Sequence, residues 1–335
     1  GMNGADVSAN YTGNEISGEA YNIFAFSIGD VSSNVINNTV LINGNYTTGM
    51  AYRGVSLSAS GNKFVLNSSE EGNESIWEGF GVEAVGIKVI KGTANIADNV
   101  IAGPGKGVSV KGNETKVVLK NNMINTVANV DKNAYAIYAN DTASLEIIDN
   151  HVDYQGTTKG TGINNAIYLY NADGAIVNGN KFDLDLVSAD VAWIEVPVGS
   201  GNWISAPISE GIVVEDSNNV TFDSNTVSTN FTDVITSYGY DTIYSVDFKN
   251  SNNAVITNNE ITSVGKDYIY GIILSGIDFT IRANNITSIG EYYANGIDIE
   301  GPASGIVENN GVLVISEVML TMYSVCLLVM WTVIL

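Results

Sequence analysis

One short pattern of apolar and polar positions repeats along the chain. An apolar residue is followed three positions later by an asparagine and, two positions further on, by another apolar residue, as in Val-Ile-Thr-Asn-Asn-Glu-Ile at 255–261. The asparagine occurs eleven times, at Asn14, Asn38, Asn62, Asn99, Asn122, Asn150, Asn180, Asn225, Asn259, Asn284 and Asn310. The ten intervals span 296 residues, so the mean repeat is 29.6 residues long. Self-similarity at this period predicts a solenoid.

Each repeat also holds a second apolar segment, usually opened by a small residue. Examples are Gly-Val-Ser-Val at 107–110, Ala-Ile-Tyr-Leu at 166–169 and Gly-Ile-Ile-Leu at 271–274. Alternation rich in β-branched residues, separated by Gly-, Asn- and Ser-rich turns, predicts short strands with one buried face. We therefore expect an all-β fold, a right-handed single-stranded parallel β-helix of about eleven coils. At about 4.8 Å per coil the rod would be on the order of 50 Å long.

The repeated asparagine has a structural explanation. A tight corner between strands needs a residue that tolerates left-handed backbone angles, and asparagine tolerates them at low cost. Stacked in register, the side-chain amides can hydrogen-bond from coil to coil as an Asn ladder. We expect these asparagines to build the fold rather than to carry function.

The coils with this asparagine resemble the right-handed β-helix of the pectate-lyase-like superfamily over residues 11–312. The chain is rich in Asn, Thr and Ser and poor in Lys and Arg. In this respect it looks like the adhesin-like surface proteins of methanogenic archaea. The repeat pattern and its loss after Val312 predict a repeat domain over 1–312, followed by an apolar C-terminal tail over 313–335.

The charge balance limits the choice of partners. The chain has 14 Lys and Arg against 36 Asp and Glu, a formal net charge of −22. Nucleic acid is therefore not expected as a partner, because phosphate binding needs clustered cations. A single cysteine, Cys326, rules out an internal disulfide framework. Ten Asn-x-Ser/Thr sequons are compatible with an extracellular or cell-surface location, although an Asn- and Thr-rich chain also produces them by chance.

Long insertions mark a candidate binding surface. The longest intervals follow Asn180, Asn62 and Asn225, and insertions in a solenoid tend to gather on one face. The inserted and following segments carry Trp193, Trp203, Tyr238, Tyr240, Tyr268, Tyr270, Tyr292 and Tyr293. Aromatic rings stack on sugar rings while carboxylates accept hydroxyl hydrogen bonds. We predict a carbohydrate platform here; the alternative is that these rings only pack the long loops onto the body.

The acidic residues allow two further interpretations. Asp241, Asp267 and Glu291 fall on successive repeats and could bind Ca²⁺ through oxygen ligands, although no cofactor is required. Asp183 and Asp185 share one face of a strand and could serve as acid and nucleophile in glycoside hydrolysis. Solvated surface charge is the simpler reading of both sets.

The residues that related enzymes use for catalysis are missing. Polygalacturonase-like members of the resembled superfamily carry a paired-Asp motif, a Gly-His-Gly and an Arg-x-Lys, and the sequence contains none of them. His151 is the only histidine and directly follows Asn150, a position that we expect to face solvent. No catalytic residue is assigned, and the enzyme reading stays second to the binding reading.

After Val312 the composition changes abruptly. Residues 318–335 form a run of eighteen uncharged, mostly apolar residues. Such a run could attach the protein to a membrane as a spanning helix, cap the last coil, or come from a shifted reading frame. Together, these features predict a secreted or cell-surface adhesin-like protein that binds glycans. The alternatives are a polysaccharide hydrolase or lyase and a structural spacer that binds nothing.

Overall fold

The protein is built from parallel strands. The computed structural model describes residues 2–5, 8–29, 31–69, 84–128, 134–156, 165–187, 194–195, 203–204, 208–232, 242–266, 268–316 and 333–334. Within these ranges the only regular elements are strands, which confirms the all-β prediction. All of them except β18 (Ile194–Glu195) and β19 (Trp203–Ile204) belong to one hydrogen-bonded network.

Strands of the network lie on three faces, which we call sheets I, II and III. Sheet I precedes each repeated asparagine, sheet II follows it, and sheet III contains the second apolar segment. Sheet I holds β2 (Ala9–Thr12), β4 (Ser32–Ile36), β10 (Thr115–Lys120), β13 (Ser144–Ile148), β16 (Ile176–Asn178), β21 (Thr221–Asp223) and β24 (Val255–Thr257). Sheet II holds β6 (Lys63–Ser68), β8 (Val100–Pro104), β11 (Met123–Ala128), β14 (His151–Gly156), β17 (Lys181–Val187), β22 (Thr226–Thr232), β25 (Glu260–Val264), β27 (Asn285–Gly290) and β29 (Gly311–Ser316). Sheet III holds β1 (Met2–Ala5), β9 (Lys106–Lys111), β12 (Ile137–Asn140), β15 (Asn165–Tyr170), β20 (Ile208–Glu215) and β23 (Thr242–Lys249).

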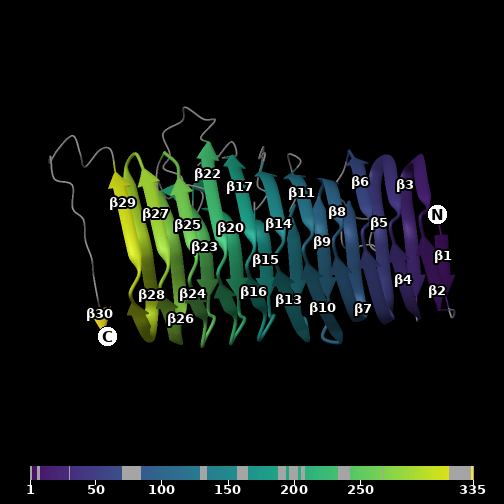
Figure 1. Cartoon of the computed structure of the whole chain (residues 1–335). Coiled ribbons are helices and arrows are strands. Elements are labelled where there is room, and N and C mark those ends of the chain that lie inside the picture. The colour runs from purple at the N-terminus through teal and green to yellow at the C-terminus, as the bar shows by residue number, and fades with distance from the viewer. Residues whose placement is uncertain are drawn as a thin grey trace.

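Five longer strands bend from one face to the next: β3 (Glu15–Gly29), β5 (Thr39–Ser60), β7 (Val85–Ala97), β26 (Tyr268–Arg282) and β28 (Tyr293–Glu308). Each strand pairs in parallel with its equivalent one repeat later, as β10 pairs with β13 and β13 with β16. The result is an elongated stack of strands with the N-terminal strands at one end and β29 at the other (Figure 1).

The repeated asparagines form the predicted ladder. In each of the ten steps, the side-chain Nδ2 of one asparagine donates to Oδ1 of the next at 2.8–3.1 Å. The same Oδ1 also accepts the backbone N–H of the preceding asparagine. From the second asparagine on, Nδ2 donates in addition to a backbone carbonyl of the preceding coil, for example from Asn122 to Ile96 at 2.8 Å. The buried amides are thus satisfied by the stack itself.

The prediction that the repeated asparagines themselves adopt left-handed backbone angles was wrong. None of the eleven adopts positive φ; the residue directly before each one does. These preceding residues are Gly13, Asn37, Gly61, Asp98, Asn121, Asp149, Gly179, Ser224, Asn258, Ala283 and Asn309. The left-handed residue turns the chain so that the following asparagine points inward, which separates the corner-forming residue from the ladder-forming one.

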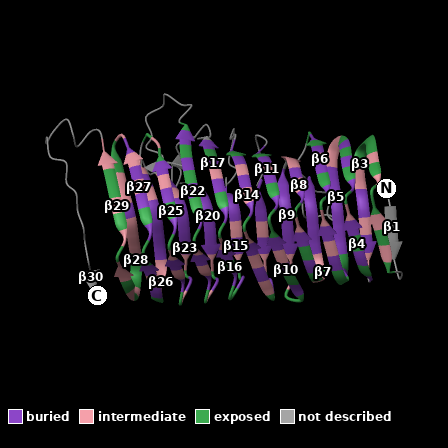
Figure 2. Ribbon diagram, in the orientation of Figure 1, coloured by how far each residue is buried: buried purple, intermediate pink, exposed green. Residues whose placement is uncertain are grey.

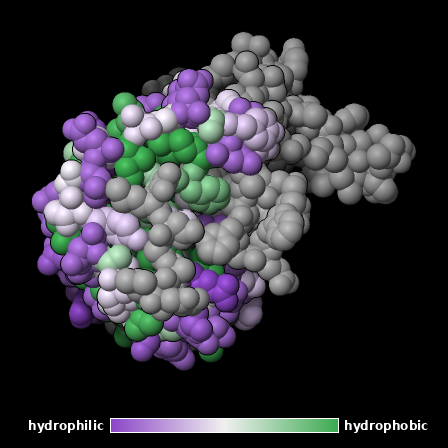
Figure 3. Space-filling model, turned by 90° about the vertical axis from the view of Figure 1, so that its right-hand side faces the viewer, coloured by the Kyte–Doolittle hydropathy of each residue, from purple (hydrophilic) through white to green (hydrophobic). Residues whose placement is uncertain are grey.

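The space between the three sheets is filled by aliphatic and aromatic side chains. Buried positions alternate with exposed ones along the strands, as Figure 2 shows. Phe182 and Phe222 stack inside with their ring centroids 6.4 Å apart, and Phe248 meets Phe222 edge-on. Seen from the end that carries the N-terminus, hydrophobic residues lie within a largely hydrophilic outline (Figure 3). The core therefore runs through successive coils.

The stack continues slightly beyond the predicted repeat region, because β29 ends at Ser316 rather than at Val312. Of residues 317–335, the structure describes only β30 (Val333–Ile334), which pairs antiparallel with Ile306 and Val307 of β28. Within the described part of the chain there is no helix with the length and apolar character needed to cross a membrane. The other residues of 318–335 lie outside the described ranges.

The ladder gives a direct stability test. Replacing Asn99 by alanine removes the acceptor for the backbone N–H and Nδ2 of Asn62. It also removes the donor to Oδ1 of Asn122. Leaving buried donors without partners should lower the free energy of unfolding by about 2–4 kcal/mol. Chemical denaturation measures this, with Asn95→Ala on an exposed position of β7 as the control. Equal effects of the two substitutions would contradict a stabilising role of the ladder.

A second test addresses the corner residue. Ala283 occupies the left-handed region at φ 56° although it has a Cβ atom. Replacement by glycine should raise the free energy of unfolding by about 0.5–1 kcal/mol, because glycine reaches this conformation without steric cost. The same change at exposed Ala20, in β3, should destabilise slightly. Destabilisation at both positions would show that the corner at 283 is not strained.

Candidate functional site

The outward side of sheet III carries the densest set of aromatic and ionisable side chains among the described residues. Sheet III strands keep a fixed register, so equivalent positions form rows along the stack. One row contains Ser109, Tyr138, Tyr168, Val213, Asp247, Ile273 and Asp298. A second contains Asn165, Glu210, Tyr244, Tyr270 and Asn295. Because the flanking residues of these strands fill the core, the rows face away from it. Ser109, Val213, Asp247 and Ile273 of the first row and Asn165 and Glu210 of the second are nevertheless buried, so only part of each row is accessible.

Four tyrosines form a first cluster on this surface, comprising Tyr135, Tyr138, Tyr168 and Tyr170. The rings of Tyr138 and Tyr168 stack with their centroids 5.9 Å apart. The rings of Tyr168 and Tyr170 stack with their centroids 6.4 Å apart and their planes nearly parallel. Tyr135 tilts against both Tyr138 and Tyr168. The Nζ of Lys106 lies 4.6 Å from the Tyr138 centroid, a cation–π contact. Tyr138, Tyr168 and Tyr170 remain partly exposed.

A second tyrosine cluster lies further along the same face. Its members are Tyr244, Tyr268, Tyr270 and Tyr293. The centroids of Tyr244 and Tyr270 are 5.1 Å apart, and Tyr293 lies 5.7 Å from both Tyr268 and Tyr270. Tyr293 is 42% exposed. Burial raises the pKa of Tyr244 to about 12 and, together with the nearby Tyr293 phenol, raises that of Tyr270. The phenols of Tyr244 and Tyr270 therefore stay neutral and can donate hydrogen bonds.

A group of buried charges lies between the two clusters. Glu210 is 5% exposed and Asp247 3% exposed. The Nζ of Lys249 donates to Oε1 of Glu210 at 2.5 Å and lies 3.5 Å from Oδ2 of Asp247. Burial, opposed by Lys249 and aided by Glu210, raises the pKa of Asp247 to about 7. The two carboxyl groups thus share one lysine, and the pair retains a proton near neutral pH.

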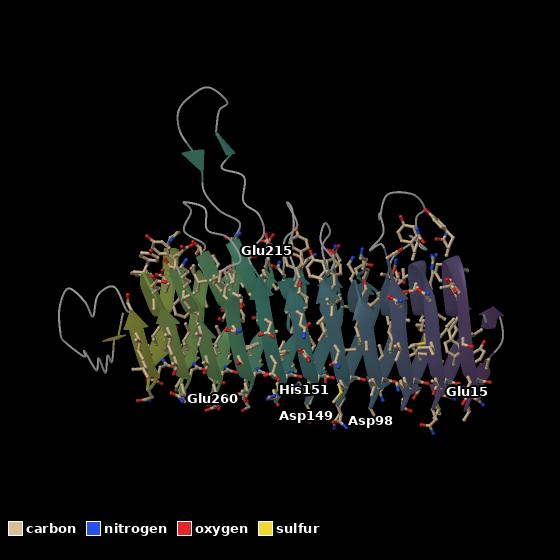
Figure 4. All side chains as sticks on the ribbon, turned by 90° about the horizontal axis from the view of Figure 1, so that it is seen from above. Glu15, Asp98, Asp149, His151, Glu215 and Glu260 are labelled. Atoms are coloured by element: carbon tan, nitrogen blue, oxygen red, sulfur yellow. The ribbon has the colours of Figure 1, made fainter. Side chains whose placement is uncertain are left out.

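Tyr168 of the first cluster bonds to a carboxylate next to this group. Its Oη donates to Oε2 of Glu215 at 2.7 Å, and Glu215 is the register partner of Lys249. Burial and this hydrogen bond raise the pKa of Tyr168. Glu215 lies on the opposite edge of the structure from Asp98, Asp149, His151 and Glu260, which flank the Asn ladder (Figure 4).

The structure describes only some of the predicted ligand-binding residues. Tyr268, Tyr270 and Tyr293 are in contact, as the prediction requires, and neighbouring Tyr292 is 39% exposed. Trp203 lies in β19, which pairs with β18. Trp193, Tyr238 and Tyr240 lie outside the described residues. The carbohydrate platform stays a prediction.

The predicted calcium site is not tested, since Asp241 and Asp267 lie outside the described residues; Glu291 is half-buried. Among the residues that the structure describes, no three His, Cys, Asp or Glu side chains come close enough to hold a metal ion.

Asp183 forms an ion-pair cluster on sheet II. Lys181 Nζ donates to its Oδ2, and Nε2 of His151 lies 2.8 Å from the same oxygen. Partial burial works against ionisation, but these hydrogen bonds hold the pKa of Asp183 below its usual value. A carboxyl group that stays ionised is a poor general acid. The prediction that His151 lies at the surface is confirmed by its 42% exposed side chain.

Sequence reasoning missed the first tyrosine cluster and the buried charges. It searched the inserted segments for aromatic residues, whereas Tyr138 and Tyr168 lie within regular strands. A usable signal was present: aligning the second apolar segments on Ala136, Ala166 and Gly211 places Tyr138, Tyr168 and Val213 in one row. The next repeats then add Asp247 and Asp298 to the row.

Comparison of the chain with models of known protein families and with curated proteins finds no match to either. The interpretation of this surface therefore depends on its geometry.

The buried carboxyl group predicts a pH dependence. The pKa of Asp247 is raised in the folded state, so its contribution to stability is present below the unfolded pKa of about 4 and is lost as the pH rises through about 7. Asp247→Asn cannot ionise and should flatten the stability profile between pH 5 and 8, gaining about 1–3 kcal/mol relative to the unmodified protein across that window.

Chemical denaturation at several pH values measures the difference. Asp185→Asn, at an exposed position of β17, is the control and should leave the slope unchanged. Parallel profiles for the unmodified protein and Asp247→Asn would show that Asp247 is ionised in the folded protein throughout.

Proposed function

We propose that this protein is an extracellular or cell-surface adhesin-like protein that binds carbohydrate through the outward side of sheet III. The observation that supports this most is the alignment of two tyrosine clusters on one face of a parallel stack.

In this proposal the stack is a right-handed parallel β-helix of about eleven coils, akin to the pectate-lyase-like superfamily. Parallel pairing between successive repeats supports a helical winding of the chain. Crossover connections between parallel strands of one sheet are right-handed in the great majority of proteins, which favours that hand. The composition, poor in Lys and Arg, supports the narrower likeness to adhesin-like surface proteins of methanogenic archaea.

The chemistry of the surface suits sugar rings. The apolar face of a pyranose packs on a phenol ring, while neutral tyrosine hydroxyls and carboxylates bond to sugar hydroxyls. Tyr138, Tyr170 and Tyr293 each keep part of the ring accessible. Trp193, Trp203, Tyr238 and Tyr240 belong to the proposed surface because, in the sequence, they fall in connections that lead from sheet II to sheet III.

The spacing of the clusters sets the size of the ligand. Five steps of the stack separate β12, with Tyr138, from β28, with Tyr293. At about 4.8 Å per step this is roughly 24 Å. A glycan chain that lies along the stack could cover both clusters, whereas a monosaccharide would contact only one. Affinity should therefore rise with chain length.

A polysaccharide hydrolase or lyase is the second candidate. It is favoured by the carboxyl pair of Glu210 and Asp247, which holds a proton near neutral pH as a general acid must. Against it, both groups are almost fully buried and bound to Lys249. Binding therefore remains the first proposal.

A glycan-array screen of the full chain, with and without Ca²⁺ and followed by product analysis of each hit, tests the proposal. We expect intact bound glycan, with affinity increasing with chain length. In the double variant Tyr138→Ala/Tyr293→Ala, affinity should fall at least tenfold, because each cluster loses one accessible ring.

Tyr21→Ala is the matched control, since Tyr21 is a 65% exposed tyrosine on β3 in the first coils, away from both clusters. Cleaved products would move the assignment to the enzyme. A blank array in both conditions would leave the structural spacer, and equal losses in the double variant and the control would reject this surface.

A further inference from the structure

Two tilted pairs of tyrosine rings on sheet III have nearly the same geometry but different neighbours. In the first cluster, the ring centroids of Tyr135 and Tyr138 lie 5.1 Å apart and the ring planes are inclined by 52°. In the second cluster, the centroids of Tyr270 and Tyr293 lie 5.7 Å apart and the planes are inclined by 48°. The group that contacts the first pair therefore indicates what the second pair can bind.

An ammonium group lies over the first pair. Nζ of Lys106 is 4.6 Å from the ring centroid of Tyr138 and 5.7 Å from that of Tyr135. Nζ of Lys111 lies 5.0 Å from the Tyr138 centroid. A cation within about 6 Å of a ring centroid is attracted by the negative face of the ring. The chain itself thus shows that a tilted tyrosine pair of this kind accommodates a primary ammonium.

The second pair of rings is not covered by a cation of the chain in this way. Among the described residues, no lysine or arginine nitrogen lies over the ring of Tyr270 or of Tyr293. Tyr293 is 42% exposed and Tyr270 is half-buried. A cationic group of a ligand can therefore reach these rings from solvent.

Two carboxylates lie beside the second pair. Asp298 and Glu300 belong to β28, the strand that carries Tyr293, and Asp298 is half-buried while Glu300 is exposed. Burial and the Tyr293 phenol raise the pKa of Tyr270, and the charges of Asp298 and Glu300 add to this rise, so both carboxylates lie close enough to act on the Tyr270 phenol. Neither carboxylate has a hydrogen bond or an ion pair with another described residue. Their charges are thus available to a ligand.

The same contrast extends along the whole of sheet III. Its strands β7 and β9 carry four lysines and no acidic residue. From β20 to the last coil, the charged residues of the sheet III segments are one lysine and five acids, namely Lys249 against Glu210, Glu215, Asp247, Asp298 and Glu300. A ligand that lies along the sheet therefore meets negative charge at the second cluster, where a cationic group is favoured.

We propose that the second tyrosine cluster binds the protonated amine of an amino sugar. The ammonium packs on the rings of Tyr270 and Tyr293, as Lys106 packs on its tyrosine pair, and Asp298 and Glu300 balance its charge. This inference rests on the proposed binding of glycan and specifies the sugar at one end of the bound chain. A neutral sugar would stack on the same rings but would gain nothing from the two carboxylates.

Calorimetric titration of the full chain with two matched glycans tests the proposal. One is the N-acetylglucosamine hexamer, and the other is the same hexamer with a single residue deacetylated, so that they differ by one positive charge. At pH 6 an amine with a pKa of about 7.7 is protonated, and we expect the amine-bearing hexamer to bind about tenfold more tightly. Asp298→Asn/Glu300→Gln should remove this preference while the neutral hexamer still binds. Tyr293→Phe should keep the preference because the ring remains, whereas Tyr293→Leu should reduce it.

The control is Asp98→Asn/Glu260→Gln, which removes two exposed carboxylates beside the Asn ladder, on the edge opposite Glu215 (Figure 4). It should keep the preference, and it separates a specific contact from the general attraction of a cation to an acidic protein. Equal affinity of the unmodified protein for the two hexamers would overturn the inference and leave glycan binding intact. An equal loss of preference in the control would also overturn it, as would failure of both hexamers to bind when the array gives another glycan. A blank array would remove the proposed function on which the inference rests.

Discussion

The structure depends on the hydrogen bonding of a buried amide. Asparagine side chains inside a protein are costly unless all their donors and acceptors are bonded. In the middle of the stack each ladder asparagine meets that requirement mainly through its neighbours, as Asn150 shows: its Oδ1 accepts twice from the coil before and its Nδ2 donates to both adjacent coils. Nδ2 of Asn99, Asn150 and Asn180 also donates to the carbonyl two residues earlier in the same coil. The amide is therefore satisfied only when successive coils are in register, and the ladder links local sequence to the alignment of the stack.

The need to keep the Asn ladder in register explains which connections of the chain vary in length. The Asn-containing corner joins sheet I to sheet II in the same way in each coil, with a left-handed residue directly before the asparagine. Length changes occur in the other two connections: from sheet III to sheet I the chain makes three-residue turns at 112–114 and 141–143 and five-residue turns at 171–175, 216–220 and 250–254, and the longest insertions lie between sheet II and sheet III. Because the ladder holds the register, residues added elsewhere do not shift the strands. Side chains on sheet III consequently meet their equivalents one coil later, which assembles the tyrosine clusters.

The sequence predicted the features that repeat and missed those that depend on only a few coils. The ladder followed from the spacing of the eleven asparagines, and the parallel strands followed from the two apolar segments. The identity of the left-handed residue was misread because that position is occupied by Gly, Asn, Asp, Ser or Ala and shows no consensus. The contact between Glu210, Asp247 and Lys249 could not be read from the chain, since it depends on register across an insertion and on burial.

The electrostatics of sheet III favour recognition over catalysis. An acid catalyst must reach the bond that it protonates, yet Asp247 is almost fully buried and in contact with Lys249. Its retained proton is explained by burial beside Glu210 and needs no catalytic role. The tyrosines differ in this respect: several rings stay accessible, and burial raises the pKa of Tyr244 and of Tyr270. Neutral, prepositioned rings lose little conformational entropy on binding, so a row of them can bind a sugar chain without any moving part. The buried charges then serve to hold the strands that present these rings, which is consistent with a surface made for binding.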